Sequence, residues 1–222
     1  MEYEPQRYEP ERERRALAVF GFPLRIDPFF FVTAWLIGGR QEPLWMLVWV
    51  VVVLTGVLAH ELGHAFAGRR LGLSPWIRLM AFGGMTGWMR PRPLTAGQQI
   101  MMSAAGPAVG ISIGGAVLVA GLAGAFAGAS PAILRVLDYV VWVNLGWGIL
   151  NLLPILPLDG GHVAGALYEG GRRRLARLRG RPDPGPVDIA RLLPVAYVVA
   201  GTLMAMAVVV IWADLVKPIS LG

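Results

Sequence analysis

Long apolar stretches, separated by short polar or Pro/Gly-rich segments, make up most of this 222-residue chain. Crossing a bilayer core of about 30 Å takes about 20 mostly apolar residues. The pattern predicts a weak span at about 20–38 and stronger ones at about 43–67, 96–128, 136–158 and 192–214. The apolar but Gly-broken segment 77–90 is too short to span. We therefore expect an all-α polytopic membrane protein with five to six transmembrane helices and a re-entrant or β-hairpin element near 77–90.

The composition supports a membrane protein and excludes several other classes. Hydrophobic residues make up 55% of the chain and charged residues only 15%, whereas soluble domains carry about 25% charged residues. The chain has no cysteine, which excludes a disulfide-stapled secreted scaffold. The low charge also argues against a disordered chain or an ordinary cytosolic enzyme. The short apolar stretch after the N-terminal tail has no clear cleavage site, so we expect no cleaved signal peptide.

The distribution of basic residues predicts the orientation. With five spans and a cytoplasmic N-terminus, 17 of the 20 Lys and Arg residues fall on the cytoplasmic side, as the positive-inside rule requires. We therefore expect a multi-pass protein of the cell (cytoplasmic) membrane. The dense basic run Arg172–Arg181 follows a span, where anionic lipid head groups attract such residues. It has no interleaved aromatic residues, so we expect the lipid bilayer and no nucleic acid as its partner.

The expected organisation is one transmembrane domain with polar attachments. We place a polar cytoplasmic tail at 1–19, a single transmembrane domain at 20–216 and, within it, a basic cytoplasmic loop at 168–191. Gly106, Gly110 and Gly114 recur every four residues in the third span, a spacing that lets helices approach closely. We expect this face to pack against neighbouring helices of the same chain rather than to form a dimer.

The clearest chemical signal is HELGH, residues 60–64, near the cytoplasmic end of the second span. His60 and His64 are four residues apart, so on a helix both imidazoles reach one metal ion, with Glu61 beside them. Two imidazoles and a carboxylate suit zinc, with a fourth position open for water. In such a site the metal activates the water and the adjacent glutamate transfers the proton. Ionisable groups are costly in an apolar span, so a purely structural role is a poor explanation for all three.

The third metal ligand must come from another segment at similar membrane depth. Asp159 satisfies this in NLLPILPLDGGH, where Pro154 and Pro157 break the helix. Irregular backbone at membrane depth is tolerated where it is buried in protein or lines a wet cavity. His162 is the rival ligand. A third arrangement, with a glutamate ligand on a later helix, would have to use Glu169, which lies beside two glycines.

These motifs together resemble the site-2 protease family of intramembrane zinc metalloproteases, peptidase family M50. HELGH and NLLPILPLDGG carry the resemblance, and GFPLRIDPFF, IRLMAFGGMTGW and SAAGP fall where that family has similar stretches. The resemblance spans about 20–165, with a HELGH helix at 43–67 and the LDGG segment within 136–162. It implies one Zn²⁺ per chain bound by His60, His64 and Asp159.

The resemblance also implies roles for residues that do not bind the metal. Glu61 is then the general acid/base. Asn151, in the Asn-x-x-Pro stretch, is a candidate for substrate binding or oxyanion stabilisation, and Asn144, one heptad earlier, is the second candidate.

The function implied by the family is hydrolysis of single-span membrane proteins near the cytoplasmic side of the bilayer. Many members carry a PDZ or CBS domain, but the longest polar stretch here is about 25 residues. We therefore expect a compact form whose specificity comes from the membrane core or from a separate regulatory partner protein. The alternative is a non-proteolytic metal carrier or partner-binding relative. Glu61 bears on this choice, because a carrier needs metal ligands but no additional glutamate beside them.

The segment 77–90 has two possible roles. It forms either a hairpin whose edge pairs with extended substrate, or an interfacial loop that faces lipid. The sequence alone favours neither.

Overall fold

The computed structural model describes residues 17–89 and 92–185, together with positions 194, 198, 201, 202 and 205. Three helical segments in this part are long and apolar enough to cross a membrane. They are α2 (Pro43–Arg70), α3 (Ala96–Leu122) and the continuous run of α4 (Pro131–Val141), the π-helix η2 (Trp142–Gly146) and α5 (Trp147–Asn151). These match the second, third and fourth expected spans. The expected span at 192–214 lies almost entirely outside the described residues.

The segment expected to form the first span begins as a strand rather than a helix. Residues Phe22–Ile26 form β2, which pairs with β1 (Leu17–Val19), and only Pro28–Ile37 are helical, as α1. Ten helical residues cover about 15 Å, half of a bilayer core. The prediction of a span from residue 20 was wrong because burial alternates along β2, a two-residue period typical of a half-buried strand.

Asp27 marks the boundary between this strand and α1. Its side chain caps the helix by accepting from the Phe29 amide, with Pro28 at the first helical position. Its other carboxylate oxygen accepts from Arg78 Nη2 at 3.0 Å, and this hydrogen bond holds the pKa of Asp27 below its ordinary value. Its amide also donates to the Leu79 carbonyl, so the start of α1 is tied to the neighbouring strand.

A four-stranded sheet of order β1-β2-β3-β4 corrects the all-α fold class. β3 (Pro75–Met80) runs parallel to β2 and antiparallel to β4 (Gly83–Trp88). The β3–β4 pair confirms the hairpin expected near 77–90. The other two strands were missed because they are short and lie within a stretch apolar enough to be taken for the start of a span.

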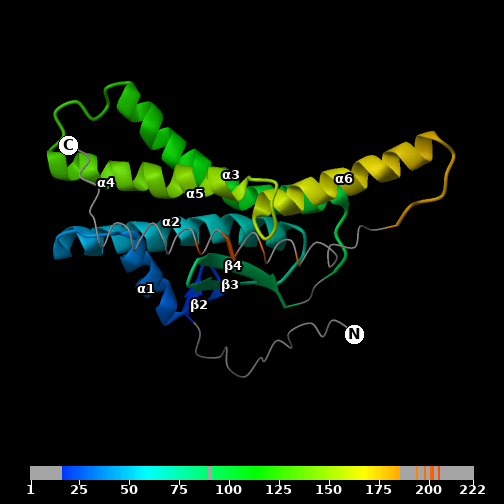
Figure 1. The fold of residues 1–222 in the computed structure, drawn as a ribbon, viewed down its shortest axis with the longest axis horizontal. Helices are drawn as coiled ribbons and strands as arrows, with labels where there is room; N and C mark the ends of the chain where they lie inside the picture. The colour runs from blue at the N-terminus through cyan, green and yellow to red at the C-terminus, as the bar shows by residue number, and fades with distance from the viewer. Residues whose placement is uncertain are drawn as a thin grey trace.

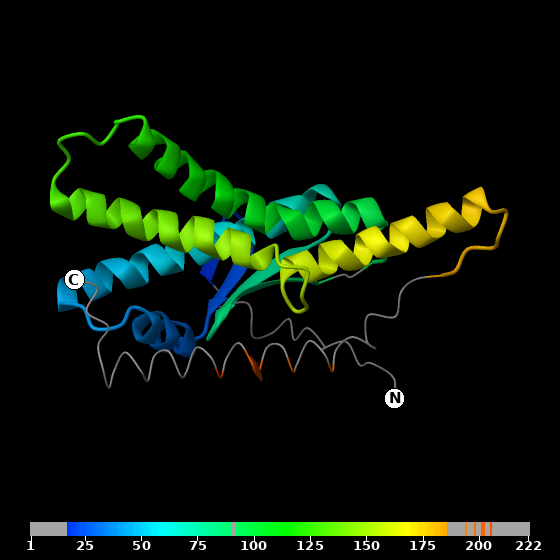
Figure 2. The same ribbon diagram turned by 45° about the horizontal axis from the view of Figure 1, so that its top comes forward.

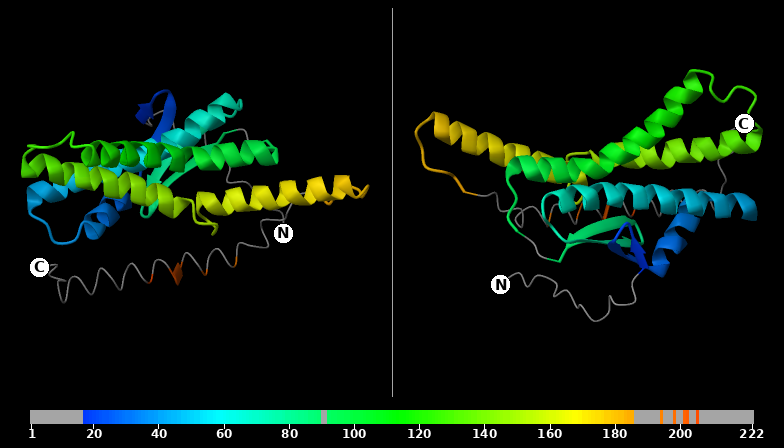
Figure 3. Two further views of the ribbon diagram at one scale, coloured as in Figure 1. Left: turned by 90° about the horizontal axis from the view of Figure 1, so that it is seen from above. Right: turned by 180° about the vertical axis from the view of Figure 1, so that it is seen from behind.

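The elements form layers around α2 (Figure 1). The sheet lies on one side of α2, whereas α3, the α4–α5 run and α6 (Asp159–Leu178) lie on the other, as the turned views confirm (Figures 2 and 3). A buried apolar core joins the sheet to α1 and α2; it consists of Phe22, Leu24, Phe30, Val57, Ala65, Ile77 and Leu79. α2 is therefore held on two opposite faces.

Glycines allow α2, α3 and the π-helix to lie almost backbone to backbone. A Cβ added at Gly63 of α2 would lie 2.6 Å from the Ala105 carbonyl oxygen of α3. On α3, a Cβ at Gly110 would meet the Asn144 carbonyl oxygen at 2.8 Å, and one at Gly114 would meet the Leu145 amide at 2.7 Å. The expected packing face of the third span is thereby confirmed.

The segment 152–158 breaks the helical path between α5 and α6, as the two prolines predict. The chain turns tightly there and brings Gly160 close to the backbone of Leu152. A Cβ added at Gly160 would lie 2.2 Å from the Leu152 carbonyl oxygen. α6 then starts at Asp159 and runs well past the end of α2 (Figure 3). The break places a helix N-terminus, with its first carboxylate, against the middle layer of the fold.

Replacing Gly63 by alanine is expected to destabilise the protein by about 1–3 kcal/mol, because the new methyl group overpacks against backbone that cannot move aside. Gly115→Ala is the matched control on α3, since nothing lies within 4 Å of its added Cβ. Thermal unfolding of the two variants in detergent measures the difference. Equal midpoints would show that the α2–α3 crossing is not tightly packed.

Candidate metal centre

Two histidines of α2 point toward the helical layer and face each other. His60 and His64 lie one helical turn apart and are 3% and 8% exposed, and their Nε2 atoms are 3.2 Å apart. Burying both imidazoles in an apolar span without a polar or metal partner would be costly. Their convergence on one point therefore indicates a shared ligand.

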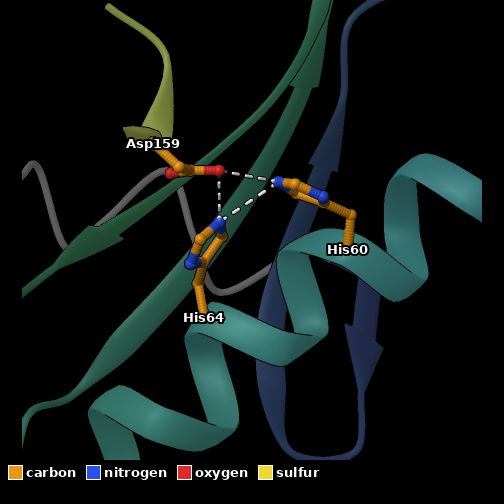
Figure 4. Close-up of side chains that lie close together, drawn as sticks. All are labelled: His60, His64 and Asp159. Atoms are coloured by element: carbon orange, nitrogen blue, oxygen red, sulfur yellow. Dashed lines mark hydrogen bonds and ion pairs between the residues drawn. The ribbon is translucent and has the colours of Figure 1, made fainter. Parts of the chain in front are cut away.

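Asp159 supplies the third group from α6 (Figure 4). Its Oδ2 lies 3.1 Å from His60 Nε2 and 3.2 Å from His64 Nε2. His60, His64 and Asp159 form a potential metal-binding group, with all three ligand atoms within 4.8 Å of one another. Residues 95 and 99 positions apart in the chain meet here because the broken segment 152–158 returns Asp159 to the depth of the histidines.

The donor set and its protonation fit zinc. His64 Nδ1 lies 2.8 Å from the Met102 carbonyl oxygen, which can only accept, so Nδ1 carries a proton, and in the neutral imidazole Nε2 presents a lone pair. In that form a lone pair and a carboxylate oxygen face each other, an arrangement that a cation between them satisfies. Tetrahedral zinc with ligand distances of about 2.0–2.1 Å separates its ligand atoms by about 3.3 Å, close to the three separations found here.

Gly106 of α3 leaves the room that this group needs. A Cβ at Gly106 would lie 2.3 Å from His64 Nε2 and 2.7 Å from His60 Nε2. A larger residue would therefore occupy the space between the imidazoles and α3. The small-residue face of the third span thus serves the site as well as the helix packing.

Glu61 lies beside His60 in sequence but points to the other side of α2, toward the sheet. It is 4% exposed, and its Oε2 accepts a hydrogen bond from Thr86 Oγ1 of β4 at 2.7 Å. Its side chain rests on Gly84, where an added Cβ would lie 2.4–2.6 Å from Glu61 Cγ, Cδ and Oε1. The sequence pointed to neither Thr86 nor Gly84, because a lone threonine and a glycine in a short apolar strand carry no chemical signature.

The two asparagines occupy different places. Asn151 lines the same cavity as the metal group, and its Nδ2 donates to the Trp147 carbonyl at 2.9 Å. Asn144 sits within the π-helix, buried against Gly56 of α2 and away from the cavity wall. The structure therefore brings Asn151 to the site but not Asn144.

The rival ligands lie outside the metal-binding group. His162 lines the cavity one helical turn after Asp159, but it is not among the three converging residues. Glu169 pairs with Arg173 at 3.0 Å on the same helix, so an arrangement with a glutamate ligand finds no support among the described residues.

A cavity of about 1030 Å³ opens beside these residues. Its apolar wall includes Met80, Phe82, Trp88 and Trp147, and His60, Glu61, His64 and Asp159 also line it. The cavity is large enough for several residues of an extended peptide. The metal group and the buried carboxylate of Glu61 thus line the same cavity.

Comparison with known proteins finds sequence similarity to zinc metalloproteases. The model of peptidase family M50 matches residues 112–182. Zinc metalloprotease Rip1 of Mycolicibacterium smegmatis is 39% identical over 83 residues, which cover 37% of this chain and 20% of that protein. The Rip3 protein of Mycobacterium tuberculosis is 36% identical over 138 residues, 61% of this chain and 32% of that protein. The aligned regions thus span no more than a third of these relatives.

The fold also has a solved counterpart. The site-2 protease from Methanocaldococcus jannaschii superposes with a TM-score of 0.54, covering 93% of this chain and 95% of that one at 19% identity. At this identity the similarity concerns the fold alone. It extends over both the sheet and the helices described above.

Replacing any one of His60, His64 or Asp159 by alanine is expected to remove the stoichiometric zinc, because two remaining ligands bind too weakly to survive purification. His162→Ala is the matched control, since it removes an imidazole from the same cavity but not from the group. Metal analysis of the purified proteins measures this. An Asp159→Ala protein that keeps its zinc, beside a His162→Ala protein that loses it, would reverse the assignment of the third ligand.

Proposed function

We propose that this chain is a member of peptidase family M50, the site-2 protease family, and acts as an intramembrane zinc endopeptidase that cleaves membrane-spanning proteins near the cytoplasmic side of the bilayer. The observation that carries the proposal is the buried carboxylate of Glu61, which lines the same cavity as the metal group without being part of it. Metal storage or transport requires ligands but no such additional carboxylate.

The residues divide the work of hydrolysis between them. Zinc, when bound, supplies a Lewis acid that polarises the scissile carbonyl and acidifies a water molecule. His60, His64 and Asp159 hold that ion from α2 and α6. Glu61 accepts the proton that the water loses as its oxygen bonds to the carbonyl carbon, and then returns it to the departing amine as the C–N bond breaks.

Asn151 is the best-placed group for holding the substrate carbonyl. It lines the cavity, and its Nδ2 donates one hydrogen to the Trp147 carbonyl, while the second amide hydrogen has no partner among the described residues. Asn144 lies away from the cavity, so the support for a substrate role rests on Asn151.

The edge of the sheet suits a substrate that has lost its helical structure. β4 is the last strand in the order β1-β2-β3-β4, and its Gly84, Thr86 and Trp88 line the cavity. A helical peptide bond is shielded by its own backbone, whereas a segment added to β4 as a strand would be held extended. This supports the substrate-pairing role of the hairpin.

We infer that the basic end of the molecule lies on the cytoplasmic side. α6 extends past the end of α2, and its arginines Arg172, Arg173, Arg174 and Arg177 gather there, as the positive-inside rule favours. Water then reaches the metal group from the cytoplasm. Single-span membrane proteins are the proposed substrates, and a separate partner protein is a proposed source of regulation.

The Glu61→Gln variant tests the reaction directly. We expect it to keep one zinc per chain but to cleave a single-span substrate in liposomes at least ~10²-fold more slowly, because an amide accepts no proton. Glu42→Gln, an exposed position at the start of α2, is the control for the loss of a carboxylate. A zinc-loaded Glu61→Gln protein that cleaves at the wild-type rate would contradict the mechanism. Zinc without cleavage by the wild type, across a panel of such substrates, would favour a metal carrier or a partner-binding relative.

Chelation gives an independent test of the metal requirement. Treatment with 1,10-phenanthroline is expected to abolish cleavage and added zinc to restore it, because His60, His64 and Asp159 offer the only group of this kind within the described part of the chain. Cleavage that persists after the metal has been shown to be removed would mean that another mechanism is at work.

A further inference from the structure

We propose that Thr86 is a positioning residue that fixes the carboxylate of Glu61 for proton transfer. The inference deepens the proposed function and rests on it, since it takes Glu61 to be the general acid/base. Thr86 belongs to β4, whereas the residues of the metal group belong to α2 and α6.

The Thr86 hydroxyl contacts Glu61 at two points. It lies 2.7 Å from the carboxylate Oε2 and 3.1 Å from the main-chain carbonyl oxygen of the same residue. A hydroxyl carries one hydrogen, and the shorter distance assigns it to the carboxylate, which is the stronger acceptor. The carboxylate of Glu61 is thus held against β4 by a single threonine hydroxyl.

The other oxygen of the carboxylate is left free for chemistry. Glu61 Oε1 has no hydrogen-bond partner among the described residues, and Glu61 lines the cavity. A flexible side chain with three rotatable bonds would otherwise reach several orientations in that space. Holding one oxygen leaves the second at a defined place, which is what a proton acceptor beside the scissile bond requires.

The sheet fixes the position of Thr86. In the β3–β4 hairpin it pairs with Ile77, which is 1% exposed in the core beneath α2. A β-branched side chain in a strand also has few rotamers. The position of the hydroxyl is therefore set by the core that joins the sheet to α2.

Gly84, two residues earlier on the same face of β4, leaves room for the carboxylate of Glu61. An added Cβ would lie 2.5 Å from Oε1, so alanine at this position must displace the carboxylate. Thr86 thus attracts the carboxylate and Gly84 leaves the space for it. Both come from the strand proposed to bind the substrate.

The test compares Thr86→Val with Thr86→Ser in the full-length, zinc-loaded protein in liposomes. Valine keeps the shape but removes the hydroxyl, and we expect kcat for a single-span substrate to fall ~10–100-fold with KM changed less than about threefold. Serine restores the donor and should keep kcat within about threefold of the wild type. Thr55→Val is the matched control, because among the described residues the Thr55 hydroxyl contacts only carbonyls of its own helix, those of Val51 and Val52.

Zinc affinity, measured by competition with a fluorescent chelator, provides a readout that does not depend on cleavage. Thr86→Val is expected to bind zinc within about threefold of the wild type, unlike a variant of His60. Gly84→Ala should reproduce the loss of kcat with zinc retained, whereas Gly97→Ala, with nothing within 4 Å of its added Cβ, should not.

The outcomes separate this inference from the proposed function. A wild-type kcat in Thr86→Val, equal losses in the valine and serine variants, or a loss confined to KM or to zinc affinity would each overturn the positioning role. Cleavage by Glu61→Gln at the wild-type rate would instead overturn the proposed function on which the role depends.

Discussion

The convergence of one carboxylate and two imidazoles inside an apolar helical layer is the constraint around which this molecule is arranged. Burying these groups in a membrane-spanning protein is unfavourable unless a cation satisfies all three. Asp159 must reach the depth of His60 and His64, which requires the helical path to break at 152–158. Gly106 must stay small, because any side chain there would fill the space at their Nε2 atoms.

The second constraint is that α2 carries site residues on two of its faces. Successive residues of a helix point about 100° apart, so adjacent His60 and Glu61 cannot face the same neighbour. The helical layer receives the histidines and the sheet receives the glutamate. The metal group and the proposed proton acceptor thus contact different elements, and the core of Val57, Ala65, Ile77 and Leu79 holds α2 against the sheet.

The parts of this arrangement that depend on local pattern could be predicted from the sequence. Local spacing alone indicates the HELGH helix, the break at the prolines around 154–157 and the packing face of the four-residue glycine repeat. The structure confirms the helices, the break and the packing. Asp159 is favoured over His162 partly by its place in the broken segment and partly by the family resemblance.

The parts that depend on long-range pairing could not be predicted. β2 pairs with β3 across some fifty residues of sequence. No pattern in Phe22–Ile26 indicates a parallel partner at Pro75–Met80, so the sequence alone assigns this stretch to a span. Thr86 and Gly84 have roles only because β4 happens to lie against Glu61. Asn144 lies one heptad before Asn151, but it sits within the π-helix, and the two asparagines therefore do not present the same face.

X-ray absorption at the zinc edge, on the full-length protein purified without chelator, tests the central claim most directly. The account predicts one zinc per chain with two imidazoles and oxygen donors at about 2.0–2.1 Å in its first coordination shell. A spectrum that requires three imidazoles would place His162 in the site and displace Asp159. A protein that purifies folded but without stoichiometric zinc, and takes up none when it is offered, would contradict the metal centre itself.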